Sequence, residues 1–252
     1  MLKGARLDER VVRDGLAETR TRAQALIRTG RVLVDDVPIE KPGTRVRDEA
    51  AIRLRGQERT FVSRGGEKLA GALADLGIDP GGLACLDLGA STGGFTDCLL
   101  RAGARRVVAV DVGYGQLDAG LRDDARVLVL ERTNARYLEA SLVPGPIDLV
   151  TIDVSFISTT LLLPRLPEVA PEAEVLVMVK PQFEVERSQV GKGGVVRDEA
   201  LRSAAADRVR GCAESLGYRL EGRVDSRVPG PKGNREIFLW LRPHLSPQGI
   251  HS

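Results

Sequence analysis

The sequence predicts an α/β protein, in which a small α+β domain precedes a Rossmann-like, doubly wound and largely parallel sheet. Beyond residue 60, short apolar runs alternate with amphipathic helical patterns, which is typical of parallel strands covered on both faces. A glycine-rich segment over residues 86–96 follows the first of these runs, as in nucleotide-binding turns. The first 60 residues instead show two short helical patterns and then a strand–turn–strand pattern.

In the first domain, apolar residues at helical spacing predict a helix that ends before Gly15. Thr21 and Gln24 have the spacing of a capping box, so we expect a second helix to open there and to stop at Gly30. Residues 32–39 predict two strands joined by a turn at two consecutive aspartates.

In the second domain, seven apolar segments predict strands, and residues 201–216 predict a helix with one apolar face. The expected strands are residues 83–88, 107–110, 127–130, 147–152, 175–179, 218–224 and 237–241. A change from polar to apolar sequence near residue 60 marks the boundary. We therefore expect a first domain over 1–58, a linker over 59–62, a second domain over 63–245 and a tail over 246–252.

The net charge is only +2, but the first domain is basic. Residues 1–60 hold 14 Lys and Arg against 10 Asp and Glu, whereas the rest holds 23 against 25. Arg20, Arg22, Arg28 and Arg31 lie on the second helix and at its exit, where they could bind phosphates. A basic module joined to a near-neutral domain indicates a polyanion partner, although an ordinary charged helical face is the alternative.

The scarce residue types exclude several functions. Both histidines lie in the last nine residues, so we expect neither a His base nor a metal site. The three cysteines lack paired spacing and fall in apolar segments, which indicates core thiols in a reducing compartment. No apolar run is long enough to span a membrane, and residues 1–8 show no signal-peptide core. We expect a cytoplasmic protein with no membrane partner.

The glycine-rich loop resembles two nucleotide motifs and matches neither. Ser91 stands where a dinucleotide fingerprint requires its middle glycine, and Phe95 stands where a P-loop requires lysine. What remains is a turn whose backbone N–H groups can approach a small carboxylate at a helix N-terminus. This suits the methionine end of S-adenosylmethionine. The candidate cofactor residues in the loop are Gly89, Ala90, Ser91, Thr92 and Gly93.

Two later strand ends extend this candidate site. Asp111 ends the next strand, where a carboxylate can accept both ribose hydroxyls of a nucleoside; a plain strand-end acid is the alternative. Thr133 and Asn134 follow the third strand and could lie near the adenine, although turn chemistry explains an Asn there nearly as well.

Four charged residues form the candidate catalytic set. Lys68 opens a predicted helix, Asp153 and Lys180 end the fourth and fifth strands, and Glu236 begins the last strand. Each alone could be a solvated charge or an ion pair, but strand ends on one edge of a sheet meet at the ligand crevice. Lys192, in a glycine-rich segment after the fifth strand, is a candidate phosphate contact on a mobile loop; a plain connector explains it equally well.

Lys68, Asp153, Lys180 and Glu236 resemble the catalytic tetrad of the FtsJ-type ribose 2′-O-methyltransferases, and the chain is similar to the TlyA family in particular. In the first domain, residues 6–8 and 21–36 resemble the S-four RNA-binding domain, which adds Arg6 to the candidate RNA contacts. The resemblance covers residues 6–242 through these segments: 62–69, 89–96, 111–117, 130–136, 153–158, 179–184 and 233–236. A linker resembling the family's carries Phe61 in place of its usual Trp, and a C-terminal extension of some relatives is absent.

The resemblance implies methyl transfer from S-adenosylmethionine to cytidine 2′-hydroxyls of ribosomal RNA in the large subunit, and leaves the small subunit open. We expect ribosomal RNA or a ribosomal subunit as partner, and a monomer or weak dimer. Lys180 is expected to take or steer the hydroxyl proton, with Asp153 and Glu236 orienting the lysines and the hydroxyl.

Three alternatives stay open at this point. An RNA-binding protein with an inactive methyltransferase domain is disfavoured because all four tetrad positions are filled. A haemolysin-like membrane-active protein, which an old family label suggests, is disfavoured by the lack of a span or signal. A nicotinamide oxidoreductase is disfavoured by Ser91 and by the lack of a His proton donor.

Overall fold

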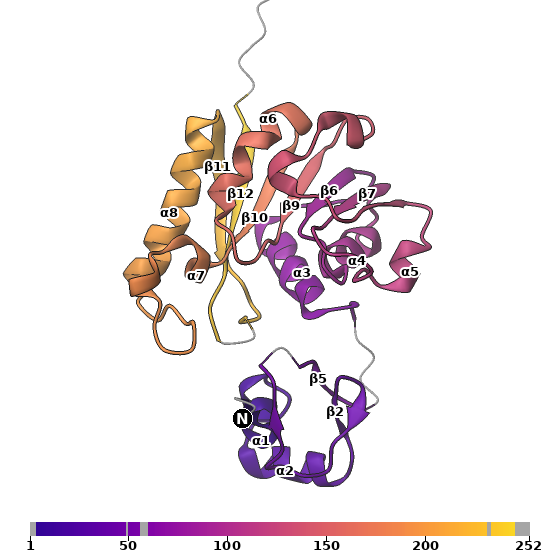
Figure 1. Cartoon of the computed structure of the whole chain (residues 1–252), viewed down its shortest axis with the longest axis vertical. Coiled ribbons are helices and arrows are strands. Elements are labelled where there is room, and N and C mark those ends of the chain that lie inside the picture. Colours follow the sequence, from indigo (N-terminus) through magenta and orange to yellow (C-terminus); the bar gives the residue numbers. More distant parts are fainter. Residues whose placement is uncertain (1–3, 49, 56–59, 231–232, 245–252) are drawn as a thin grey trace, which may run out of the picture. The chain divides into compact units, whose positions relative to one another are not determined.

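The computed structural model describes residues 4–48, 50–55, 60–230 and 233–244. The chain divides into two compact units, residues 1–59 and 60–252, and each is described by itself (Figure 1). The predicted tail over 246–252 and the first residue of the predicted linker lie outside the described residues.

The first unit packs two helices against short antiparallel strands. The sheet has the order β3-β2-β5, and β1 pairs separately with β4. The apolar core contains Leu7, Val11, Ala23, Ile27 and Val32. The elements are β1 (Ala5–Arg6), α1 (Leu7–Arg13), α2 (Arg20–Arg28), β2 (Val32–Val34), β3 (Val37–Pro38), β4 (Arg45–Val46) and β5 (Ile52–Leu54).

The predicted start of the second helix was wrong. Helix α2 begins at Arg20, and the Thr19 hydroxyl accepts a hydrogen bond from the Arg22 N–H at 3.2 Å. The backbone of Thr19 is extended, so its side chain can turn back over the first helical N–H groups, whereas Thr21 already lies inside the helix. The predicted turn is confirmed: Asp35 and Asp36 both have positive φ, as a tight hairpin turn requires.

The second unit contains a seven-stranded sheet in the order β11-β12-β10-β9-β6-β7-β8. All seven predicted strands are present, and β6 to β10 pair in parallel, whereas β12 runs antiparallel to both its neighbours. The doubly wound, largely parallel sheet is confirmed. The strands are β6 (Ala84–Leu88), β7 (Arg106–Val110), β8 (Val127–Leu130), β9 (Leu149–Ile152), β10 (Glu174–Val179), β11 (Tyr218–Asp225) and β12 (Ile237–Pro243).

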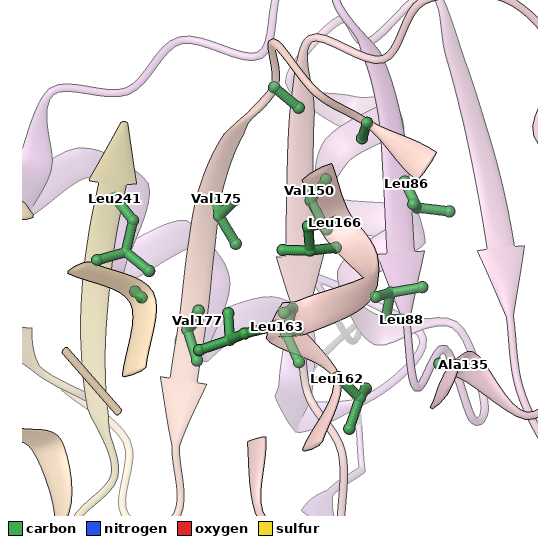
Figure 2. Packing of buried hydrophobic residues seen from close by; sticks show 14 of the residues in the cluster. Leu86, Leu88, Ala135, Val150, Leu162, Leu163, Leu166, Val175, Val177 and Leu241 are labelled. Atoms are coloured by element: carbon green, nitrogen blue, oxygen red, sulfur yellow. The ribbon is translucent and has the colours of Figure 1, made fainter. Parts of the chain in front are cut away.

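Helices cover both faces of this sheet, and alternate residues of each strand point to opposite faces. Leu86, Val150 and Val177 face the cluster that includes Leu163 and Leu166, as Figure 2 shows. The opposite face packs against α3 and α4. The helices are α3 (Arg64–Leu76), α4 (Gly94–Arg101), α5 (Ala119–Arg122), α6 (Leu166–Val169), α7 (Pro181–Glu184) and α8 (Glu199–Ser215), with 3-10 turns η1 (Ala135–Tyr137), η2 (Ala140–Leu142), η3 (Thr159–Leu161), η4 (Leu163–Arg165) and η5 (Arg187–Gln189).

Helix α3 begins four residues earlier than predicted, with Ser63 as its N-cap. Gly66 lies in the first turn of α3, and this position requires glycine. A Cβ there would meet the Phe61 side chain at 2.4 Å and the Gly94 carbonyl at 2.9 Å. The glycines therefore serve the close approach of α3 to α4 rather than a loop before the helix. Lys68 accordingly lies in the second turn and does not open the helix.

Candidate active site

The predicted site residues of the second unit gather where the parallel strands end. Leu88 of β6 pairs with Ile152 of β9, so Gly89 and Asp153 follow neighbouring strands at the same edge. A Cβ on Gly89 would lie 2.6 Å from the Asp153 carbonyl oxygen, and Gly89 has φ +90°. Only glycine at position 89 therefore allows the glycine loop to approach the segment after β9 so closely.

Lys68 and Glu236 form a buried ion pair, with Lys68 Nζ 2.9 Å from Glu236 Oε1. The lysine comes from α3 and the glutamate directly precedes β12, 168 residues further along the chain. The other oxygen, Glu236 Oε2, is buried and has no hydrogen-bond partner among the described residues. Glu236 Oε2 is thus an unsatisfied acceptor inside the protein, directly beside the Lys68 pair.

Lys180 and Asp153 form the second pair, with Lys180 Nζ 2.5 Å from Asp153 Oδ1. Lys180 also donates to the Ser155 hydroxyl at 2.7 Å. Both side chains of the pair are partly exposed, so this pair is the more accessible of the two.

Strand register brings the two pairs to the same edge of the sheet. Val179 of β10 faces Ile237 of β12, so Lys180 and Glu236 extend one antiparallel pairing by a residue. The structure thus gathers all four residues of the predicted tetrad at the carboxyl ends of β9 and β10.

The glycine loop supplies a turn without a phosphate cradle. Ser91 has φ +50°, and Gly93, the N-cap of α4, has φ +95°. A Cβ at Gly93 would meet Leu121 at 2.3 Å and Leu117 at 2.9 Å, so an apolar wall packs against the loop. Gly93 therefore packs against α5 and the residues before it, whereas Ser91 and Thr92 of the loop are exposed.

Asp111 ties the loop to the next strand end. Its carboxylate accepts hydrogen bonds from the Ser91 N–H at 2.8 Å and the Gly113 N–H at 2.7 Å. A carboxylate has about four acceptor positions, so two remain for hydroxyl groups. A small pocket adjoins it, lined by Ala90, Ser91, Ala109, Asp111, Gly113, Gln116, Leu117, Val129 and Glu131.

Glu131 is a pocket residue that the sequence interpretation missed. It follows β8 as Asp111 follows β7, and that position after a strand was the signal that could have identified it. Its carboxylate accepts from the Gly115 N–H at 2.8 Å and from Arg122, and the Arg122 hydrogen bond lowers the pKa of Glu131. Glu131 is therefore anchored as an anion at the pocket wall.

Thr133 and Asn134 do not line this pocket. The Thr133 N–H donates to the Asp111 carbonyl at 3.0 Å, and the Asn134 side chain caps η1 by accepting from the Arg136 N–H. In this structure, turn chemistry accounts for both residues.

Asp87 is a second residue that the sequence interpretation missed. It lies on β6, two residues before the glycine loop begins at Gly89. Its carboxylate is fully buried and accepts from the Thr96 hydroxyl at 2.7 Å and the Thr151 hydroxyl at 3.0 Å. Burial raises the pKa of Asp87 to about 7, and the nearby Asp153 adds to this rise, whereas the threonine hydrogen bonds oppose it. An acidic residue inside an otherwise apolar strand was the available signal.

Two loops at the site are joined through Glu184 of α7. This buried carboxylate accepts from the Ser158 hydroxyl at 2.5 Å and the Thr159 N–H at 2.7 Å. The same loop carries Phe156, which has φ +69° and is 92% exposed, with its ring 5.4 Å from that of Phe183. An aromatic ring held in the open in an unfavourable backbone conformation indicates a binding role.

The segment around Lys192 forms a tight turn closed by a bridge between Gly191 and Val195. Asn234 anchors it by accepting from the Val196 N–H at 3.0 Å and donating to the Gly194 carbonyl at 2.8 Å. Lys192 is exposed on this turn. The residue that anchors the turn, Asn234, lies two positions before Glu236 in the sequence.

The predicted RNA contacts of the first unit divide into two groups. Arg6 and Arg20 both bind Asp8. Arg22, Arg28 and Arg31 are exposed and make no ion pair with any described residue. Arg22 and Arg31 also line a groove, whose other lining residues are Leu16, Ala17, Glu18, Thr19, Leu26 and Leu54.

Two further searches concern only the described residues. No three His, Cys, Asp or Glu side chains there are grouped so as to hold a metal ion. No helix within the described ranges is long and apolar enough to cross a membrane.

The Rossmann-like sheet, the glycine loop and the two lysine–carboxylate pairs define an α/β enzyme of the methyltransferase class. The FtsJ-like methyltransferase family model matches residues 61–243, and the S4 domain model, which is the S-four domain, matches residues 5–52.

Relatives extend this match over nearly the whole chain. The 16S/23S rRNA (cytidine-2′-O)-methyltransferase TlyA of Mycobacterium tuberculosis is 50% identical over 99% of this chain and 96% of its own length. Hemolysin A of Brachyspira hyodysenteriae is 41% identical over 92% and 98%. A solved structure from Streptococcus thermophilus, described as a hemolysin candidate, is 37% identical with a TM-score of 0.79, covering 100% of this chain and 92% of that one. The chain belongs to the TlyA family of FtsJ-like methyltransferases.

Proposed function

We propose that this chain transfers a methyl group from S-adenosylmethionine to the ribose 2′-hydroxyl of a cytidine in ribosomal RNA. The observation that carries the proposal is the gathering of two lysine–carboxylate pairs beside the glycine loop. The TlyA relative named above supports ribosomal RNA and cytidine as the substrate.

We assign the nucleoside end of the cofactor to the side of the glycine loop on which Asp111 lies. Ala109, Leu117 and Val129 offer an apolar surface for a flat base, and the Asp111 carboxylate retains capacity for ribose hydroxyls. S-adenosylmethionine, when bound, supplies an electrophilic methyl group on a sulfonium. We assign its binding to Gly89, Ala90, Ser91, Thr92, Gly93 and Asp111, with Glu131 as an added contact.

The tetrad supplies proton handling and positioning. A ribose hydroxyl must lose its proton as its oxygen forms the new bond to carbon, and Lys180 Nζ is the accessible nitrogen of the site. Asp153, whose Oδ1 lies 2.5 Å from Lys180 Nζ, orients this lysine toward the hydroxyl. Lys68 holds Glu236 in place, and the unpaired Glu236 Oε2 is available to orient the hydroxyl.

We propose that RNA contacts come from both units, with residues 1–58 as an RNA-binding domain, 59–62 as a linker and 63–245 as the catalytic domain. The exposed arginines of the first unit supply phosphate contacts. In the second unit, Phe156 is placed to stack on a nucleobase, and Lys192 is placed for a phosphate.

The direct test replaces Lys180. Lys180→Ala should abolish methyl transfer to ribosomal RNA from cells that lack the activity, measured by mass spectrometry of the RNA nucleosides. Calorimetry should show that S-adenosylmethionine still binds, because Lys180 lies outside the pocket lining. Arg219→Ala, which alters an exposed cation on β11 of the second unit, is the control and should retain full activity.

The same measurements discriminate the alternatives. Near-normal turnover by Lys180→Ala would remove Lys180 from its assigned role. A chain that binds RNA but no S-adenosylmethionine would be an RNA-binding protein with an inactive domain. Lysis of liposomes by the purified chain would instead favour the membrane-active alternative that two relatives' names suggest.

A further inference from the structure

A buried carboxylate lies among the arginines expected to bind RNA. The Asp8 side chain has no exposed surface and accepts four hydrogen bonds from three residues. Arg6 donates to both oxygens, each at 3.0 Å, Arg20 Nε donates at 3.0 Å, and Gln24 donates at 2.9 Å. Asp8 thereby joins the end of β1, the start of α1 and the first turn of α2.

Both arginines keep part of their head groups at the surface. The side chains of Arg6 and Arg20 are 40% and 51% exposed, although each donates to a carboxylate that solvent does not reach. A guanidinium has five N–H groups, and Asp8 uses only two on Arg6 and one on Arg20. Free N–H donors therefore remain on both guanidiniums, and Asp8, as their shared acceptor, fixes the positions of the two groups.

The charge of Asp8 is unexpected for a surface that binds a polyanion. By charge alone, a carboxylate among these arginines should weaken binding to RNA phosphates. The hydrogen bonds from Arg6 hold the pKa of Asp8 well below its usual range, so this negative charge persists at neutral pH. A benefit must offset it, and holding two flexible side chains in one geometry before binding supplies such a benefit.

We propose that Asp8 is a positioning residue for RNA binding, which holds Arg6 and Arg20 as a two-arginine fork for the phosphate backbone. This inference rests on the proposed function. Asp8 acts through the arginines and does not itself contact the RNA.

The decisive variant is Asp8→Asn in the full chain, with purified, unmethylated 50S ribosomal subunits as the probe. Charge removal alone predicts tighter binding, whereas loss of positioning predicts binding weaker by about tenfold, as expected when two arginine side chains must be ordered on binding. The slope of log affinity against log salt should also become shallower by about 1 to 2. The two explanations therefore predict opposite signs.

Glu9→Gln is the matched control. Glu9 is the next residue and also a carboxylate, but it is half exposed and lies only loosely against the arginines, 3.5 Å from Arg20 and 4.0 Å from Arg6. Its neutralisation should leave affinity unchanged or raise it slightly. Thermal unfolding of each variant checks the fold, and Gln24→Met, which removes one bond to Asp8 without changing charge, should weaken binding in the same direction as Asp8→Asn.

A double-mutant cycle then isolates the coupling. Arg20→Ala should weaken binding less in the Asp8→Asn background than in the unmutated chain, because Arg20 is no longer held. Equal losses in both backgrounds, or an Asp8→Asn variant that binds as tightly as the unmutated chain, would overturn the inference alone. Failure of the unmutated chain to bind either ribosomal subunit would instead overturn the proposed function.

Discussion

At the residue scale, Asp87 shows how burial can make one side chain sensitive to pH. Its two threonine donors do not compensate for the loss of water, so the pKa of Asp87 rises to about 7 from a usual value near 4. Between about pH 4 and 7, the folded protein therefore retains a proton that the unfolded chain has released. The stability of the folded state must fall as pH rises through that window.

Asp87→Asn should remove this pH dependence, because the amide keeps the shape of the side chain and cannot ionise. We compare the melting temperature of the variant with that of the unmutated chain at the same pH. From pH 5 to pH 8, this difference should shift in favour of the variant by at least about 2–4 °C, which corresponds to roughly 1 kcal/mol in a unit of this size. Thermal unfolding at three pH values is the measurement. Glu172→Gln, which alters an exposed carboxylate, is the control, and parallel curves for Asp87→Asn and the unmutated chain would contradict the prediction.

Single residues were predictable from sequence where their position along a strand was informative. Asp111, Asp153, Lys180 and Glu236 were identified because a charged residue at the end of an apolar strand is visible in the sequence. Their pairing was not predictable, since the partner of Lys68 is 168 residues away and is brought near by β12. The role of Asp8 was not predictable beyond the motif over residues 6–8, because its burial depends on donors from another helix.

At the element scale, the contact between α3 and α4 depends on glycine. A Cβ on Gly94 would lie 2.1 Å from Ser63 Oγ and 3.0 Å from the Gly66 nitrogen, so the helix starts could not approach. Gly94→Ala should destabilise the chain by about 1–3 kcal/mol, as overpacking does elsewhere. Gly211→Ala in α8 is the contrasting substitution, because no atom lies within 4 Å of its added Cβ.

Gly211→Ala should raise stability by about 0.5–1 kcal/mol through the higher helix propensity of alanine. Urea unfolding of both variants measures the difference, and equal shifts would show that contact between the helices does not depend on Gly94.

Glu184 joins two elements of the site, and its removal tests how far loop position matters. Glu184→Ala leaves the buried Thr159 N–H without its acceptor, which should cost about 1–3 kcal/mol of stability. Because that loop also carries Asp153 and Ser155, the methyl-transfer rate should fall while S-adenosylmethionine affinity stays the same. Glu184→Gln should restore part of both losses, and a rate unaffected by Glu184→Ala would show that the loop is held by other contacts.

Elements with strong apolar patterns were predictable, whereas helix starts depended on contacts that the sequence does not display. All seven strands of the large sheet were found from apolar segments, and the signal is continuous in β6, β9 and β10, which are buried on both faces. The starts of α2 and α3 were misplaced because Thr21 fitted a capping pattern and the glycines before Lys68 suggested a loop. The short strands β1, β4 and β5 were missed because they lack the turn of two aspartates that marked the equally short β2 and β3.

At the scale of the whole molecule, the two units should respond differently to salt. Five arginines of the first unit, namely Arg6, Arg20, Arg22, Arg28 and Arg31, are assigned to phosphates, whereas the cofactor pocket of the second unit relies on short-range contacts. If each arginine neutralises one phosphate, log affinity for the 50S subunit should fall against log salt with a slope of about −4 to −5. Raising KCl from about 50 to 200 mM should then weaken RNA binding by about 10²- to 10³-fold.

Binding of S-adenosylmethionine should change little over the same range, because few charges are exchanged with solvent at Asp111 and its pocket. Filter binding for the subunit and calorimetry for the cofactor measure both in the same buffers. Arg28→Ala should make the RNA slope shallower by about 1, since Arg28 is exposed and makes no ion pair with a described residue that would compete for it. A slope shallower than about −2 in the unmutated chain would mean that most of these arginines do not contact phosphates, and that the second unit carries recognition of the RNA.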